Sequence, residues 1–130
     1  MSVYHRTLIQ ITLLLSLVLC APGFSVAADG ASAMKQMATI MHRLKHYPSP
    51  QGKETLQAIV NNKSTNKNEV TLAKAMLNLE HKVISADIAG LQSITESSDA
   101  TADEKALATI LLNFSHRPSG ADKKRLKSMM

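Results

Sequence analysis

The chain has 130 residues, a formal net charge of +5 and one cysteine. Removing residues 1–28, the leader described next, removes one basic residue and leaves 14 basic and 10 acidic residues, a net charge of +4. About 100 residues suit one domain with a modest core. This mild charge favours solubility or weak attraction to anionic surfaces, and it argues against a dedicated nucleic-acid-binding protein.

The first segment resembles a cleavable export signal. His5 and Arg6 precede an apolar run from Leu8 to Leu19, and small residues follow up to Ala28. The run is about a dozen residues, whereas a spanning helix needs about 20. We expect a signal peptide over 1–28 with cleavage after Ala28, a periplasmic or secreted protein, and one helical-repeat domain over 29–130 with no transmembrane span.

Cys20, the single cysteine, lies inside this leader. A lipoprotein signal would place the cysteine first after cleavage with small residues before it, and Leu17-Val18-Leu19 fits that pattern poorly. We therefore expect Cys20 to be removed with the leader. The mature chain would then have no disulfide and no thiolate chemistry.

The remaining chain repeats itself at an interval of 35 residues, marked by His46, His81 and His116. Such a period with matched apolar positions predicts an array of similar helical units. The approximate units are 31–63, 64–98 and 99–130. The matched apolar columns are Met37/Leu72/Leu107, Ala38/Ala73/Ala108, Met41/Met76/Leu111, Leu44/Leu79/Phe114, Leu56/Leu91/Leu126 and Ile59/Ile94/Met129.

Within each unit the apolar spacing is helical. Positions nine, five and two residues before each histidine fall on one helix face, and a shorter amphipathic helix follows the histidine. The sequence therefore predicts an all-α protein: three tandem 35-residue helix-turn-helix repeats forming a short solenoid or a compact six-helix bundle.

Helix start signals occur at corresponding places in the units. Asn66–Glu69 and Thr101–Glu104 both have the pattern of a capping box, and Ser119–Asp122 is a further cap signal. In the first unit, Ser49 precedes a proline at the first helical position, where the missing N–H costs nothing.

The first-helix patterns Leu72-Ala73-x-x-Met76 and Leu107-Ala108-x-x-Leu111 resemble those of tetratricopeptide repeats. The second helices depart from that family, because Ala89 and Lys124 stand where an aromatic residue would be expected. The period is 35 rather than 34 residues. We do not assign the chain to that family, and none of its ligand-binding residues can be transferred.

The histidines are the sharpest candidate feature. His46, His81 and His116 are each expected in the last turn of a first helix, and Asp87 and Asp122 follow the second and third of them by six residues. We expect a structural turn clamp in which each histidine bonds a helix-end carbonyl or the aspartate. A response to pH is an alternative, because histidine titrates in the physiological range.

Metal or haem binding by these histidines is a further alternative. Equivalent positions in neighbouring units should lie about 8–10 Å apart, so one shared ion is disfavoured unless the array is sharply curved. His42 and His46 form a second metal candidate, because an i, i+4 pair on one helix face can hold an ion from two sides.

The basic residues of the last helix, Lys123, Lys124, Arg125 and Lys127, are expected to face solvent. A solvated face is the default interpretation, and contact with an anionic envelope surface is the functional alternative. Nucleic-acid binding is not expected, because Tyr47 and Phe114 are the only aromatic residues after the leader and cannot form a stacking platform.

No catalytic motif is found in the sequence, so we expect a non-enzymatic protein without a cofactor. The first hypothesis is a protein-binding or scaffold module whose partner is another envelope protein. A homodimer through an uncapped end of the array is a related expectation. The alternatives are a metal- or haem-handling protein and a peripheral binder of the envelope surface.

Overall fold

The computed structural model describes residues 32–130, so the expected leader, its cleavage site and Cys20 lie outside the described residues. The described part is all-helical, which confirms the predicted class. No helix in this part is long and apolar enough to span a membrane. The helices are α1 (Ala33–Arg43), α2 (Pro50–Asn61), α3 (Lys67–Leu77), α4 (Ser85–Glu96), α5 (Ala102–Leu112) and α6 (Gly120–Lys127).

The helices begin where the capping signals predict. Asn66, Thr101 and Ser119 each accept a hydrogen bond from the backbone N–H three residues on, and the acidic residue there bonds back to the cap. Ser49 caps α2 directly before Pro50. Each such cap satisfies an N–H that has no partner within the helix, which typically contributes about 1 kcal/mol.

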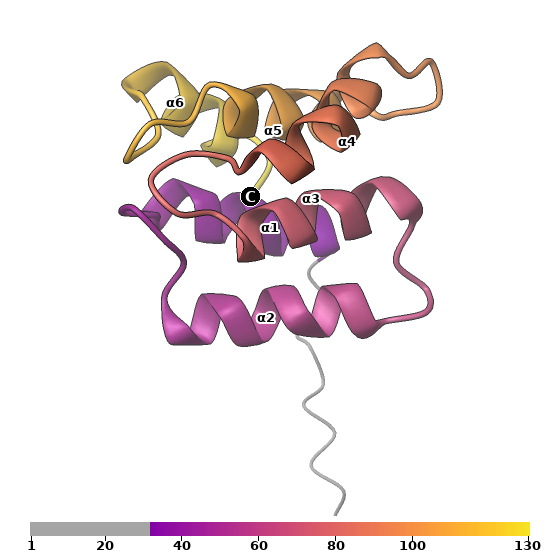
Figure 1. Cartoon of the computed structure of the whole chain (residues 1–130), viewed down its shortest axis with the longest axis horizontal. Helices are drawn as coiled ribbons and strands as arrows, with labels where there is room; N and C mark the ends of the chain where they lie inside the picture. Colours follow the sequence, from indigo (N-terminus) through magenta and orange to yellow (C-terminus); the bar gives the residue numbers. More distant parts are fainter. Residues whose placement is uncertain (1–31) are drawn as a thin grey trace, which may run out of the picture.

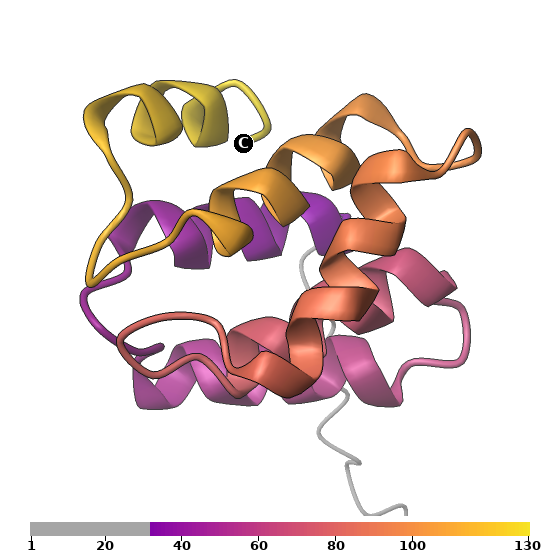
Figure 2. The same cartoon turned by 45° about the horizontal axis from the view of Figure 1, so that its top comes forward.

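The helices form an inner and an outer set (Figures 1 and 2). α1, α3 and α5 contact one another, while α2 packs mainly against α3 and α4 against α5. α6 packs against α1, so the last helix of the described part lies against the first. The expectation of a homodimer through an end of the array stays a prediction, although α6 lies against α1 in the described part.

Every apolar column predicted from the 35-residue interval lies in the core. The three positions of the first helices and the leucine of the second helices are fully buried, and the remaining columns are at most 8% exposed. Full burial of one such side chain contributes about 1.5–3 kcal/mol. The small alanines at positions 38, 73 and 108 are also fully buried, as expected where helices approach closely.

The connections α1–α2, α3–α4 and α5–α6 gather at one end of the molecule, at the left of Figure 2. Each carries one of the three histidines outside any helix, since α1 ends at Arg43, α3 at Leu77 and α5 at Leu112. Their expected position in the last helical turn is therefore wrong. The histidines lie in the turns, where the backbone can direct them toward one another.

Candidate metal centre

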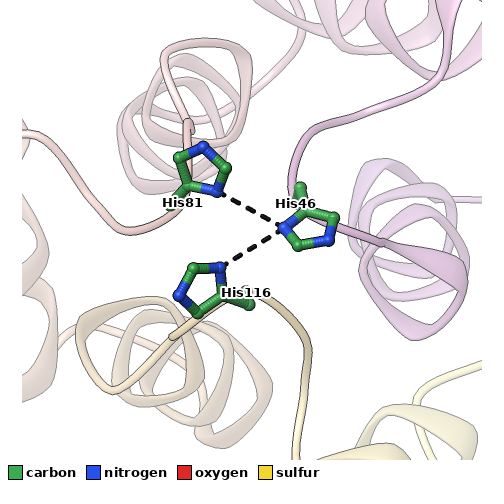
Figure 3. Close-up of side chains that lie close together, drawn as sticks. All are labelled: His46, His81 and His116. Carbon is green, nitrogen blue, oxygen red and sulfur yellow. Dashed lines mark hydrogen bonds between the residues drawn. The ribbon is translucent and has the colours of Figure 1, made fainter.

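His46, His81 and His116 converge on one point (Figure 3). Nδ1 of His46 lies 3.3 Å from Nδ1 of His81 and 3.3 Å from Nδ1 of His116. All three rings can present a nitrogen within 4.8 Å of the other two. The expectation that they would lie a helix-packing distance apart is wrong, because the packing of the helices brings the three turns together.

The turns are joined to one another through their backbones. The N–H of His46 donates to the carbonyl of His116 at 2.7 Å, and the N–H of His116 donates to the carbonyl of His81 at 2.9 Å. These bonds link residues that are 35 and 70 positions apart. They fix the relative positions of the three Cα atoms, so the rings meet without depending on long flexible side chains.

Two of the three histidines have an uncommon backbone conformation. φ is 65° at His46 and 62° at His116. Each is the central residue of a γ-turn closed by a 2.7 Å bond from the following N–H to the preceding carbonyl. γ-turns with positive φ are rare and strained. Strain of this kind is found mainly where the surrounding structure enforces it, often at functional sites.

The residues after these turns help to hold them. Pro48 and Pro118 follow His46 and His116 by two positions, and both are buried against the body of the protein. Val83 occupies the corresponding place after His81 and is also buried. The buried residue anchors each loop while the histidine two positions earlier stays exposed at the surface.

A single two-centre hydrogen bond accounts for only one of the two contacts made by Nδ1 of His46. A neutral imidazole has one N–H and one acceptor nitrogen, so Nδ1 of His46 has either a single hydrogen or a single lone pair. It nevertheless faces two other Nδ1 atoms at 3.3 Å. If each imidazole has its hydrogen on Nε2, three lone pairs face a common centre, which is the arrangement that a cation requires.

The spacing also fits a transition metal. A tetrahedral ion with metal–nitrogen bonds of about 2.0–2.1 Å holds two imidazole nitrogens about 3.3–3.4 Å apart. Both distances from His46 Nδ1 have this value. The ring centroids are 5.1–5.4 Å apart and the planes are inclined by 53–79°, so the rings surround the centre rather than stacking.

The aspartates of the expected turn clamp have other partners. Asp87 accepts a hydrogen bond from Asn78 Nδ2 at 3.1 Å. Asp122 accepts from the N–H of Ser119 at 2.9 Å and from its hydroxyl at 2.6 Å, as part of the α6 capping box. Within residues 32–130 neither carboxylate bonds a histidine. Asp87 links the first turn of α4 to the end of α3, Asp122 caps α6, and the histidines meet one another.

His42 is not a member of the cluster. An i, i+4 pairing of His42 with His46 requires one continuous helix, but α1 ends at Arg43 and His46 lies in the following turn. The two residues therefore do not have i, i+4 helical geometry. His42 instead lines a groove beside the cluster together with Arg43 and Lys45.

The basic residues of α6 are exposed as predicted, with Leu126 buried beneath them. They do not share one role. Arg125 forms an ion pair with Asp103 of α5 at 3.0 Å, whereas Lys123 lines the groove beside His46 and His116.

One buried charged residue was recognised from sequence only as a helix cap. Glu104, at 2% exposure, closes the α5 capping box and also accepts hydrogen bonds from Asn66 and Asn68 at the start of α3. Burial alone would raise the pKa of Glu104, but the bonds from Thr101, Asn68 and Asn66 together lower it below its ordinary value. The capping pattern indicated the local bond, and nothing in the spacing indicated the link to α3.

Comparison of the chain with protein-family models, with curated proteins and with solved structures finds no match.

Proposed function

We propose that this protein binds one divalent transition-metal ion, best zinc, through Nδ1 of His46, His81 and His116. The observation that carries the proposal is the pair of 3.3 Å separations at His46 Nδ1. They match the spacing of two ligands on one tetrahedral ion. Imidazole suits zinc, copper, nickel and iron, so zinc is the first probe and copper and cobalt are the comparisons.

The proposal includes the architecture that supports the site. The three hairpins are copies of one 35-residue unit, arranged as a compact closed six-helix bundle rather than an open solenoid. Each copy contributes one ligand at the same position of its turn. A bound ion would tie three turns that are far apart in sequence, so binding adds directly to the stability of the fold.

Metal binding has more specific support than the protein-binding role first expected. That role relied on a continuous face and on apolar ends without obvious caps, whereas in the described part α6 packs against α1. The structural turn clamp differs from the metal proposal in one respect. It needs the backbone bonds between the turns, but it gives no reason for three nitrogens of the same kind to face one centre.

We also propose that the protein is exported and works in the periplasm or outside the cell. The support is the leader-like sequence up to Ala28. The N-terminal residue of protein recovered from the cell envelope or the medium tests this directly. Export and cleavage as proposed give a chain that begins at Asp29, and a chain that keeps residues 1–28 would contradict it.

The metal proposal is tested by titrating purified, chelator-treated protein with Zn²⁺ in a calorimeter. We expect one ion per chain. At a free concentration of about 100 times Kd the ion should stabilise the fold by about 2.7 kcal/mol. The same titration with Co²⁺ should give the visible absorption of a four-coordinate ion.

The decisive variants are H46A, H81A and H116A, with H42A as the matched control. His42 is a nearby histidine that lies outside the cluster, so its removal alters the histidine content without removing a proposed ligand. We expect each of the three to lose at least tenfold in affinity, and H42A to keep the wild-type value. Equal losses in all four variants, or no binding to the wild-type chain, would refute the proposal.

A further inference from the structure

A groove opens beside the histidine cluster between the end of α1 and the start of α6. Its volume is about 730 Å³, within the range of small-molecule sites. His46 and His116 lie in its wall. A ligand in the groove would therefore have direct access to an ion held by the cluster.

The groove is basic and contains no carboxylate. Arg43, Lys45, Arg117 and Lys123 line it, and all four side chains are exposed. In residues 32–130 the one ion pair formed is Arg125–Asp103, which lies elsewhere on α5 and α6. The four charges of the groove are thus not neutralised by neighbouring acids, and a small anion can approach all of them.

A second hollow, beside His81, differs in charge. It is lined by one lysine, Lys53, and one acid, Glu80, together with Tyr47, Asn78 and apolar residues. Its charges balance, so it offers no comparable attraction for an anion. The difference in charge between the two hollows indicates that an anionic ligand would reach the cluster through the groove beside His46 and His116.

We infer, on the basis of the proposed metal site, that a small oxyanion carrying carboxylate or phosphate groups completes the coordination of the metal. Three neutral imidazoles leave the ion with its full charge and a fourth position. One oxygen of the anion fills that position. Its remaining oxygens bond the guanidinium groups of Arg43 and Arg117 and the ammonium groups of Lys45 and Lys123, since charge-assisted bonds to arginine are strong and can be bidentate.

This arrangement makes metal and anion binding interdependent. The anion neutralises the combined charge of the metal and the groove, so each ligand binds more tightly when the other is present. Such coupling is reciprocal for equilibrium affinities.

The test uses Co²⁺-loaded and metal-free protein, titrated separately with succinate and with inorganic phosphate. We expect at least one of them to shift the visible spectrum of the bound cobalt, and to bind the metal-free protein at least tenfold more weakly. Succinate and phosphate distinguish a carboxylate from a phosphate ligand. Equal affinity for the loaded and metal-free forms would overturn the inference.

The matched variants K123A and K124A each remove one exposed lysine of α6. Of these two adjacent lysines, Lys123 lines the groove and Lys124 does not. The double variant R117A/K123A should lose at least tenfold in anion affinity and, when neither anion is present, should not lose metal affinity; K124A should match the wild type. An equal loss in K124A would overturn the inference. Metal binding without any anion binding would also overturn it while leaving the proposed function intact, and absence of metal binding would refute both.

Discussion

Glu104 is the one charged side chain buried in the described core, and it joins two hairpins. Its carboxylate accepts a bond from the N–H of Thr101 at 2.7 Å within α5. It also accepts bonds from Asn66 Nδ2 at 3.0 Å and Asn68 Nδ2 at 3.3 Å at the start of α3. The substitution E104Q removes the charge while keeping the size of the side chain.

The expected loss follows from what the amide cannot do. All three partners donate hydrogen bonds, and a glutamine must direct an NH₂ group at one or more of them. Hydrogen bonds to charged groups are worth about 1.5–3 kcal/mol each, and their contributions within one network are not additive. We expect E104Q to lower the free energy of unfolding by about 2–3 kcal/mol. For a domain of this size, that lowers Tm by about 10–20 °C.

The difference between wild type and E104Q should also depend on pH. Because folding lowers the pKa of Glu104, the folded state favours the ionised carboxylate. The stabilisation is therefore complete above the pKa of the unfolded chain, about 4.3 for glutamate. It is lost as the pH falls through the lower pKa of the folded state. The two proteins should then differ most near neutral pH and converge in strong acid.

Urea unfolding followed by circular dichroism measures both effects, with E69Q as the control. Glu69 holds the same place in the α3 capping box, where it bonds the N–H of Asn66 at 3.3 Å. It has no role in the link to α5, so E69Q should cost about 0.5 kcal/mol or less. Equal losses for E69Q and E104Q would refute the reasoning, because they would show that the link between α3 and α5 contributes nothing.

Three further predictions concern stability. In metal-free protein, H46G should be at least as stable as wild type, because glycine adopts the positive φ of 65° without strain. His81 has no positive φ, so H81G should lower the free energy of unfolding in urea by about 0.5–1 kcal/mol. The reverse order of stability would contradict the presence of strain at His46. L91A should lower the free energy of unfolding by about 2–5 kcal/mol, because Leu91 is fully buried. Ile88, on the same helix, is 37% exposed, so I88A should lower it by about 0.5 kcal/mol or less. Equal shifts of Tm for the two variants would refute the assignment of Leu91 to the core. S119A removes the α6 cap and should lower the free energy of unfolding by about 1 kcal/mol. An unchanged midpoint of urea unfolding would show that the cap is dispensable.

Local features of the fold were predictable from the sequence. The capping boxes at Asn66 and Thr101 depend on side chains three residues apart, and both form as predicted. The apolar columns are also a local property, because the spacing along a helix decides which side chains share a face. The basic residues around Leu126 were correctly expected to face solvent for the same reason.

The start of each turn was less predictable. The helices end three or four residues before the histidines, so a residue expected on a helix lies in a loop. The positive φ of His46 could not be expected from residue type, since glycine is the usual choice for that conformation. The backbone bond from His46 to His116 helps to hold it, and these residues are 70 positions apart.

The 35-residue interval determined, from the sequence alone, that three histidines occupy equivalent places and that matched apolar residues form the core. It could not determine how far apart the histidines lie, because a period specifies spacing along an array and not its curvature. Curvature depends on the angles at which helices from different hairpins pack, and these follow from side-chain contacts across the whole molecule. The packing of α6 on α1 was decided at that level, and with it the meeting of His46, His81 and His116 at one point.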